Sequence, residues 1–102
     1  MKNVLIIARL ITSVPTPDQV TVKNISIIGA VTLADVKRAF EESNNKIDII
    51  ITGAGIELKD RLEIIKYIFE TSDDVSVHMK DRASGQQGFI PFINKVLNGL
   101  IG

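Results

Sequence analysis

Short apolar runs alternate along this chain with longer segments whose apolar residues recur at helical spacing. The apolar runs cover residues 4–8, 25–28, 47–51 and 75–79. Runs of four or five residues have the length of β-strands, and the longer periodic segments have the length of helices. Strands that alternate with helices form a parallel sheet, so the pattern predicts an open, mostly parallel four-stranded α/β fold with three helices, flavodoxin-like or Rossmann-like.

The three predicted helices cover residues 32–44, 57–70 and 89–98. Thr32 and Asp35 open the first helix with the spacing of a capping box, in which each side chain satisfies a free backbone amide. The third helix is expected to begin near Phe89, because Pro91 is tolerated only in the first turn. In the second helix we expect a buried stripe made of Leu58, Leu62, Ile65 and Phe69, widened by Ile64 and Ile68.

The segment between the first two strands, residues 10–24, lacks a helical pattern. Pro15 and Pro17 lie inside it and exclude a regular helix. Residues 20–22 alternate apolar and polar, as a brief extra strand would.

The patterns of the four strands predict their order in the sheet. Residues 4–8 are apolar throughout, and residues 47–51 are apolar except at Asp48, which is typical of strands buried on both faces. The other two strands alternate and suit the edges. We therefore predict the order 2-1-3-4, with the first two helices on one face and the last helix on the other.

Composition adds a prediction about assembly. The chain has 102 residues, the size of a single α/β domain, with 45% hydrophobic residues and a mean hydropathy of +0.22. One helix and a proline-containing loop cover a four-stranded face thinly. We therefore expect a homo-oligomer, most simply a dimer, that buries apolar surface left on that face.

Charge and cysteine content limit the expected binding partners and the expected cellular location. Twelve basic and twelve acidic residues cancel, so long-range attraction to nucleic acid or to anionic membranes is not expected. No apolar run approaches the roughly 18 residues that span a bilayer. The absence of cysteine excludes disulfides and thiolate metal sites, and it fits a cytoplasmic protein. The sequence requires no cofactor and contains no pattern of metal ligands.

The element order from residue 25 to residue 98 resembles a response-regulator receiver domain without its first helix and one βα unit. This resemblance implies a fold but not the family's chemistry. Receiver domains use a pair of acidic residues after the first strand and a phosphoacceptor aspartate after the third. Here Arg9 follows the first strand, and Thr52 and Gly53 end the third. Lys80 lies where receivers keep a phosphate-binding lysine.

Polar and small residues follow the predicted strands at their carboxyl ends, where ligands bind in such sheets. The candidate ligand-binding residues are Arg9, Thr52, Gly53, Gly55, Lys80 and Arg82. The glycines would offer backbone amides to an anion, and the three cations would suit a phosphate or a carboxylate. The structural alternatives are a tight strand-to-helix turn at Gly53 and a solvated loop in which Asp81 pairs with a neighbouring cation.

His78, the only histidine, and Asp81 are the candidate proton-transfer groups, with Ser84 nearby in sequence. The simpler interpretation of His78 is a partly buried histidine of an edge strand. Three functions remain open at this point. The chain is a non-catalytic binding or interaction domain for a small anionic ligand, or an enzyme that acts on a phosphorylated or carboxylated substrate, or an assembly subunit. We favour the first.

Overall fold

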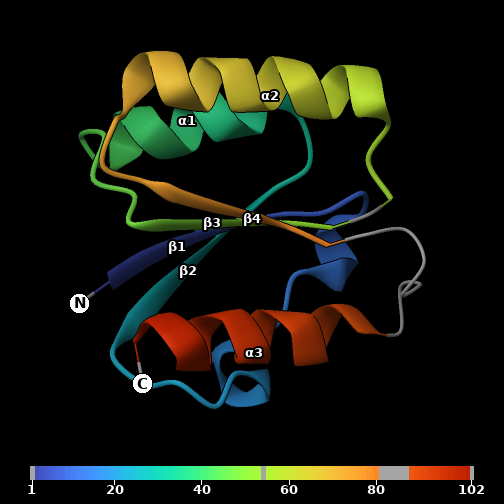
Figure 1. Ribbon diagram of the computed structural model, residues 1–102, viewed down its shortest axis with the longest axis vertical. Helices are drawn as coiled ribbons and strands as arrows, with labels where there is room; N and C mark the ends of the chain where they lie inside the picture. The colour runs from blue at the N-terminus through green and yellow to red at the C-terminus, as the bar shows by residue number, and fades with distance from the viewer. Residues whose placement is uncertain (1, 54, 81–87, 102) are drawn as a thin grey trace.

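The computed structural model describes residues 2–53, 55–80 and 88–101 (Figure 1). Its strands are β1 (Lys2–Ile7), β2 (Ile25–Ala30), β3 (Ile49–Thr52) and β4 (Ser76–Met79). Its α-helices are α1 (Leu33–Glu42), α2 (Leu58–Thr71) and α3 (Phe89–Leu100). Among the described residues, no helix is both long enough and apolar enough to cross a membrane.

The four strands form one parallel sheet in the order β2-β1-β3-β4. This order confirms the prediction from the apolar runs, with β1 and β3 at the centre and fully buried along most of their length. Parallel strands with helical crossovers on one face and α3 on the other make this an α/β fold, and the strand order is compatible with a flavodoxin-like topology.

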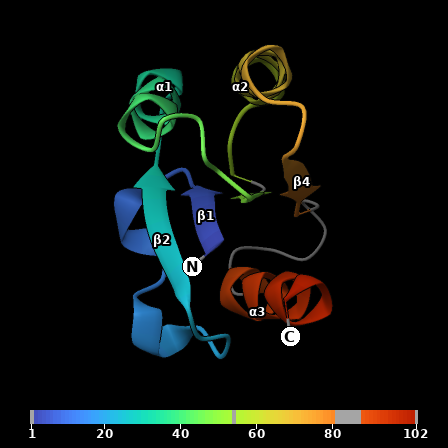
Figure 2. The same ribbon diagram turned by 90° about the vertical axis from the view of Figure 1, so that its left-hand side faces the viewer.

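The helices form two layers around the sheet. Helices α1 and α2 cover one face, and α3 covers the other, as Figures 1 and 2 show. Residues 10–24 share the second layer with α3. They contain two 3-10 turns, Ile11–Ser13 and Pro17–Gln19, and residues 20–22 form no strand. The prolines thus exclude a regular helix, as expected, and the loop takes the place of one.

Each face of the sheet has its own apolar core. On the α1 and α2 side, buried residues include Leu5, Ile7, Val36, Phe40, Ile50, Ile64 and Ile68. On the α3 side they include Val4, Ile6, Ile49, Ile51, Phe89, Ile93 and Leu97, with Val20 from the loop. The loop therefore closes the second core beside α3, so the face expected to be thinly covered is well buried.

Helix α1 begins as its sequence predicts. The backbone amide of Asp35 donates to Oγ1 of Thr32, and Oδ2 of Asp35 accepts from the amides of Thr32 and Val31. Thr32 and Asp35 therefore satisfy free amides at the start of the helix. Beyond the other end of α1, Asn44 and Asn45 adopt positive φ angles of 54° and 62°. Asparagine tolerates this conformation better than most residues.

Helix α2 shows one clear difference from the prediction. Ile64 and Ile68 are buried against the sheet, whereas Leu58, Leu62 and Phe69 are 57%, 56% and 56% exposed. The helix carries two apolar stripes about a quarter to a third of a turn apart. Packing against the sheet selects the stripe of Ile64 and Ile68, and the stripe predicted to be buried lies outside the core.

Candidate functional site

The carboxyl ends of β1, β3 and β4 lie at one edge of the sheet. Ile7 is paired with Thr52, and Thr52 with Met79. The ladder extends one step further, because the amides of Gly53 and Lys80 donate to the carbonyls of Ile7 and Thr52, at 2.8 and 3.0 Å. The register therefore brings the ends of these three strands together, as expected for a site in a parallel sheet.

The predicted site residues differ in their exposure at this edge. Arg9 and Gly55 are exposed, whereas Thr52, Gly53 and Lys80 are buried. Asp81, Arg82 and Ser84 lie outside the described residues, so their predicted roles remain predictions.

Lys80 is the least expected of these residues. It is 2% exposed, although its place after an edge strand suggests a solvated side chain. Lysine is almost never this buried unless its ammonium has a partner. Lys80 does take part in an interaction within the chain.

His78 lies on the same face of β4 as Lys80, because residues two apart in a strand point the same way. Its neighbour in register, Ile51, belongs to the core on the α3 side. The His78 Nε2 atom is buried and has no hydrogen-bond partner within the described part of the chain. His78 and Lys80 therefore point toward the layer that contains α3.

Thr52 points to the opposite face. Ile50 and Ile7 lie on that side and belong to the core beneath α1 and α2. Thr52 is 1% exposed, and its Oγ1 atom finds no hydrogen-bond partner among the residues described. A buried hydroxyl without a partner is unfavourable. Thr52 and Lys80 thus belong to different faces and do not share one pocket.

The environment of Gly53 limits the predicted anion cradle. Its amide is already bonded to Ile7, and a Cβ at this position would lie 3.5 Å from Cζ of Phe89. The backbone of Gly53 is therefore packed under the first residue of α3. Of the two glycines, only Gly55 is exposed to solvent.

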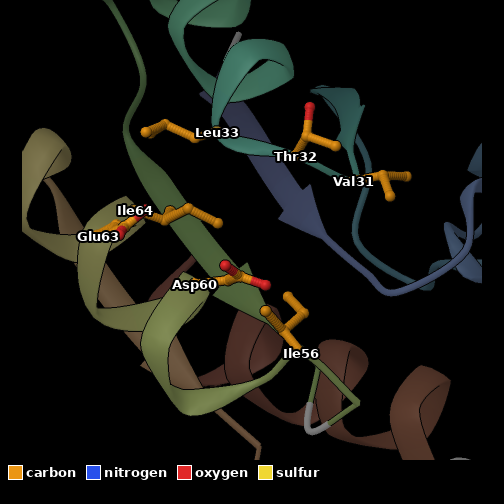
Figure 3. Close-up of a pocket in the computed structure, with 7 residues that line it drawn as sticks. All are labelled: Val31, Thr32, Leu33, Ile56, Asp60, Glu63 and Ile64. Carbon is orange, nitrogen blue, oxygen red and sulfur yellow. The ribbon is translucent and has the colours of Figure 1, made fainter.

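A pocket that the sequence does not predict lies at the same sheet edge, between the start of α1 and the start of α2 (Figure 3). Its volume is about 180 Å³, and its lining residues are Val31, Thr32, Leu33, Ile56, Asp60, Glu63 and Ile64. The Asp60 carboxylate points into the space beside Ile56. The two carboxylates make this pocket acidic, so it suits no anion.

A second, shallower hollow of about 410 Å³ lies at the start of β2 and includes Pro17, Val22 and Ile25. It is remote from the carboxyl edge and contains none of the candidate residues. Within the described ranges, no group of three or more histidine, aspartate or glutamate side chains is arranged to hold a metal ion.

Comparison of the chain with protein-family models, with curated proteins and with solved structures found no match. The resemblance to receiver domains therefore remains one of topology. Function has to be argued from the site itself.

Proposed function

We propose that this chain is a non-catalytic binding domain that takes a small anionic ligand at the carboxyl edge of the sheet, on the side of α3. The observation that carries the proposal is the burial of Lys80 at the end of β4, with 2% of its surface exposed. A buried ammonium attracts negative charge more strongly than an exposed one, because the surrounding protein screens it less. A phosphate or a carboxylate beside Lys80 would add to the contact that this lysine already makes.

Two neighbouring groups support an anionic ligand. His78 points to the same side as Lys80, and its unpaired Nε2 atom can donate a hydrogen bond to an oxyanion when the nitrogen is protonated. Arg9 follows β1, which β3 separates from β4, and it is exposed, so its guanidinium can contact a ligand that extends across the end of β3. The reversal of winding between β1 and β3 lies beside Arg9, at the place where ligands of doubly wound sheets bind.

Self-association is the second part of the proposal. Helix α2 exposes Leu58, Leu62 and Phe69, each by more than half of its surface. Large apolar side chains grouped on one helix face are typical of an interface. We therefore propose that a second copy of the chain is the protein partner.

Titration with inorganic phosphate, followed by calorimetry and by amide chemical shifts, tests the ligand site. We expect the Lys80→Met change to weaken phosphate binding by about tenfold or more, as for loss of a charged hydrogen bond. Arg9→Met is the safer companion variant, because Arg9 is exposed and its replacement leaves the core intact. It should weaken binding by a few fold.

Lys46→Met is the matched control, since Lys46 is an exposed lysine just before β3, at the opposite end of the strands. It should leave the phosphate affinity unchanged. The ligand proposal is wrong if the wild-type chain does not bind phosphate or phosphate esters, or if Lys46→Met weakens binding as much as Lys80→Met does.

A further inference from the structure

The exposed apolar residues of α2 have the spacing of a helix-pairing seam. Leu58, Leu62, Ile65 and Phe69 are separated by four, three and four residues. This alternation of three and four places apolar side chains along one line of a helix, as in helices that pack against each other. Three of the four are more than half exposed, so the seam has no partner within the described part of the chain. We call these four residues the α2 seam.

The seam faces away from α1. Tyr67 marks the side of α2 toward α1, because its ring packs edge-on against Phe40 at 5.8 Å and lies under the Lys37 ammonium. On a helical projection the seam lies nearly opposite Tyr67. Figure 2 shows α1 on one side of α2 and the β4 edge of the sheet on the other. The seam therefore overhangs the edge of the sheet at β4.

Strand β4 offers unpaired backbone groups at the same edge. It is the last strand in the sheet order. The amides of Ser76 and Lys80 donate toward β3, to Asp48 and Thr52. Alternate residues of a strand direct their backbone groups to opposite sides, so those of Val77 and Met79 point outward. Such an edge pairs readily with another strand. Met79 is also 41% exposed and extends the apolar surface below the seam.

We propose that two copies of this chain associate across a two-fold axis beside β4, with the α2 seams packed antiparallel and the two β4 edges paired into one continuous sheet. This inference rests on the self-association proposed above and names its surface. A two-fold axis perpendicular to the sheet keeps both α2 helices on the same face and makes adjacent strands and helices antiparallel. The same two-fold axis thus packs the two α2 seams together and pairs the two β4 edges.

The charges beside the seam favour a second copy in that orientation. Lys59 and Glu70 are exposed and lie near the two ends of the seam, one position after Leu58 and Phe69. An antiparallel copy therefore brings Lys59 of one chain toward Glu70 of the other, whereas a parallel copy in register brings like charges together. Lys66 and Glu70 already lie 3.9 Å apart within one chain.

Sedimentation equilibrium between micromolar and millimolar concentrations tests this interface. We expect the wild-type chain to reach twice its mass of 11.2 kDa. Leu62→Glu introduces a charge at the centre of the seam and should raise the dissociation constant by about 100-fold or more. Because Leu62 is 56% exposed, the variant should keep its far-ultraviolet circular dichroism. Phe69→Glu provides a second test of the same seam.

Leu100→Glu is the matched control, because Leu100 is 50% exposed and lies at the end of α3 in the other layer. It should remain dimeric. Hydrogen exchange adds a readout of the strand edge. The amides of Val77 and Met79 should exchange more slowly in the wild-type dimer than in the Leu62→Glu variant.

The possible outcomes distinguish self-association in general from association through this particular surface. A wild-type chain that stays monomeric at millimolar concentration overturns self-association and this surface together. A dimer that survives Leu62→Glu and Phe69→Glu overturns the seam while self-association stands. A dimer without slower exchange at Val77 and Met79 overturns the strand pairing. Phosphate affinity should be the same in Leu62→Glu and in the wild type.

Discussion

The backbone amide of Thr21 donates a 2.9 Å hydrogen bond to Oδ1 of Asn94, a residue 73 positions further along the chain. The same side chain donates through Nδ2 to the carbonyl of Gln19 at 3.2 Å. Asn98, one turn later in α3, donates to Oγ1 of Thr21 at 2.9 Å. Asn94 thus satisfies two backbone groups of the loop, Asn98 contacts the hydroxyl of Thr21, and together they hold the loop against α3.

We predict that Asn94→Ala destabilises the fold by about 1 to 2 kcal/mol, because two loop groups lose their partner. Urea denaturation monitored by circular dichroism measures the change. Lys95→Ala, at the exposed neighbouring position, should alter stability by less than about 0.5 kcal/mol. Equal effects of the two substitutions would show that the contacts of Asn94 are unimportant.

Thr52→Val should leave the stability unchanged or raise it by up to about 1 kcal/mol. The two side chains have the same shape, and the buried Oγ1 of Thr52 has no hydrogen-bond partner within the described residues. Thermal unfolding at pH 7 measures the change. A clear loss of stability would mean that the hydroxyl has a partner in solution, such as an ordered water molecule.

Lys80→Glu should destabilise the fold by more than about 2 kcal/mol. It reverses the charge of a side chain that is 2% exposed and breaks the contact that Lys80 makes. The sequence alone suggested an exposed loop position, at which such a change is nearly neutral. Lys59→Glu on the surface of α2 is the comparison. If both variants unfold at the urea concentration of the wild type, Lys80 is solvated.

Acid should weaken the start of α1 through Asp35. Hydrogen bonds from the amides of Val31 and then of Thr32 lower the pKa of Asp35 below its usual value of 3.8. The carboxylate therefore contributes stability above the unfolded pKa, and this contribution is lost as the pH falls through the lower, folded value. Asp35→Asn should cost only about 0.5 to 1 kcal/mol at pH 7, because solvent partly screens this carboxylate, whose side chain is 33% exposed.

The difference in stability between the wild type and Asp35→Asn should shrink as the pH falls from about 4 through the lower, folded pKa of Asp35, because both side chains are uncharged once that carboxylate is protonated. Denaturant unfolding at a series of pH values measures it. Asp73→Asn, the same substitution in an exposed turn, is the control variant. A difference between wild type and Asp35→Asn that persists unchanged to pH 2 would contradict the role of the charge.

Strand order and helix starts could be predicted from the sequence because each depends on local pattern. Continuous apolar residues at 4–8 and 47–51 require two covered faces, which only central strands have. The pair Thr32 and Asp35 forms a capping box within four residues of chain. The carboxyl edge followed from the same reasoning, since parallel strands end together.

The properties of the candidate site depended on segments remote in sequence. Burial of Lys80 and the packing of Phe89 over Gly53 require the layer formed by α3. The pocket beside Asp60 forms only where α1 and α2 approach each other. No local pattern reports these contacts, because the residues that make them are tens of positions apart.

Helix α2 shows most directly what the sequence determined and what only the tertiary structure decided. Its sequence determined a helix with two apolar stripes, one through Leu62 and one through Ile64 and Ile68. Periodicity alone cannot say which stripe is buried, because both have helical spacing. The tertiary structure decided it, because the connection from β3 and the contact with α1 fix the rotation of the helix about its own axis. That rotation buries the isoleucines and leaves the seam facing the open edge at β4.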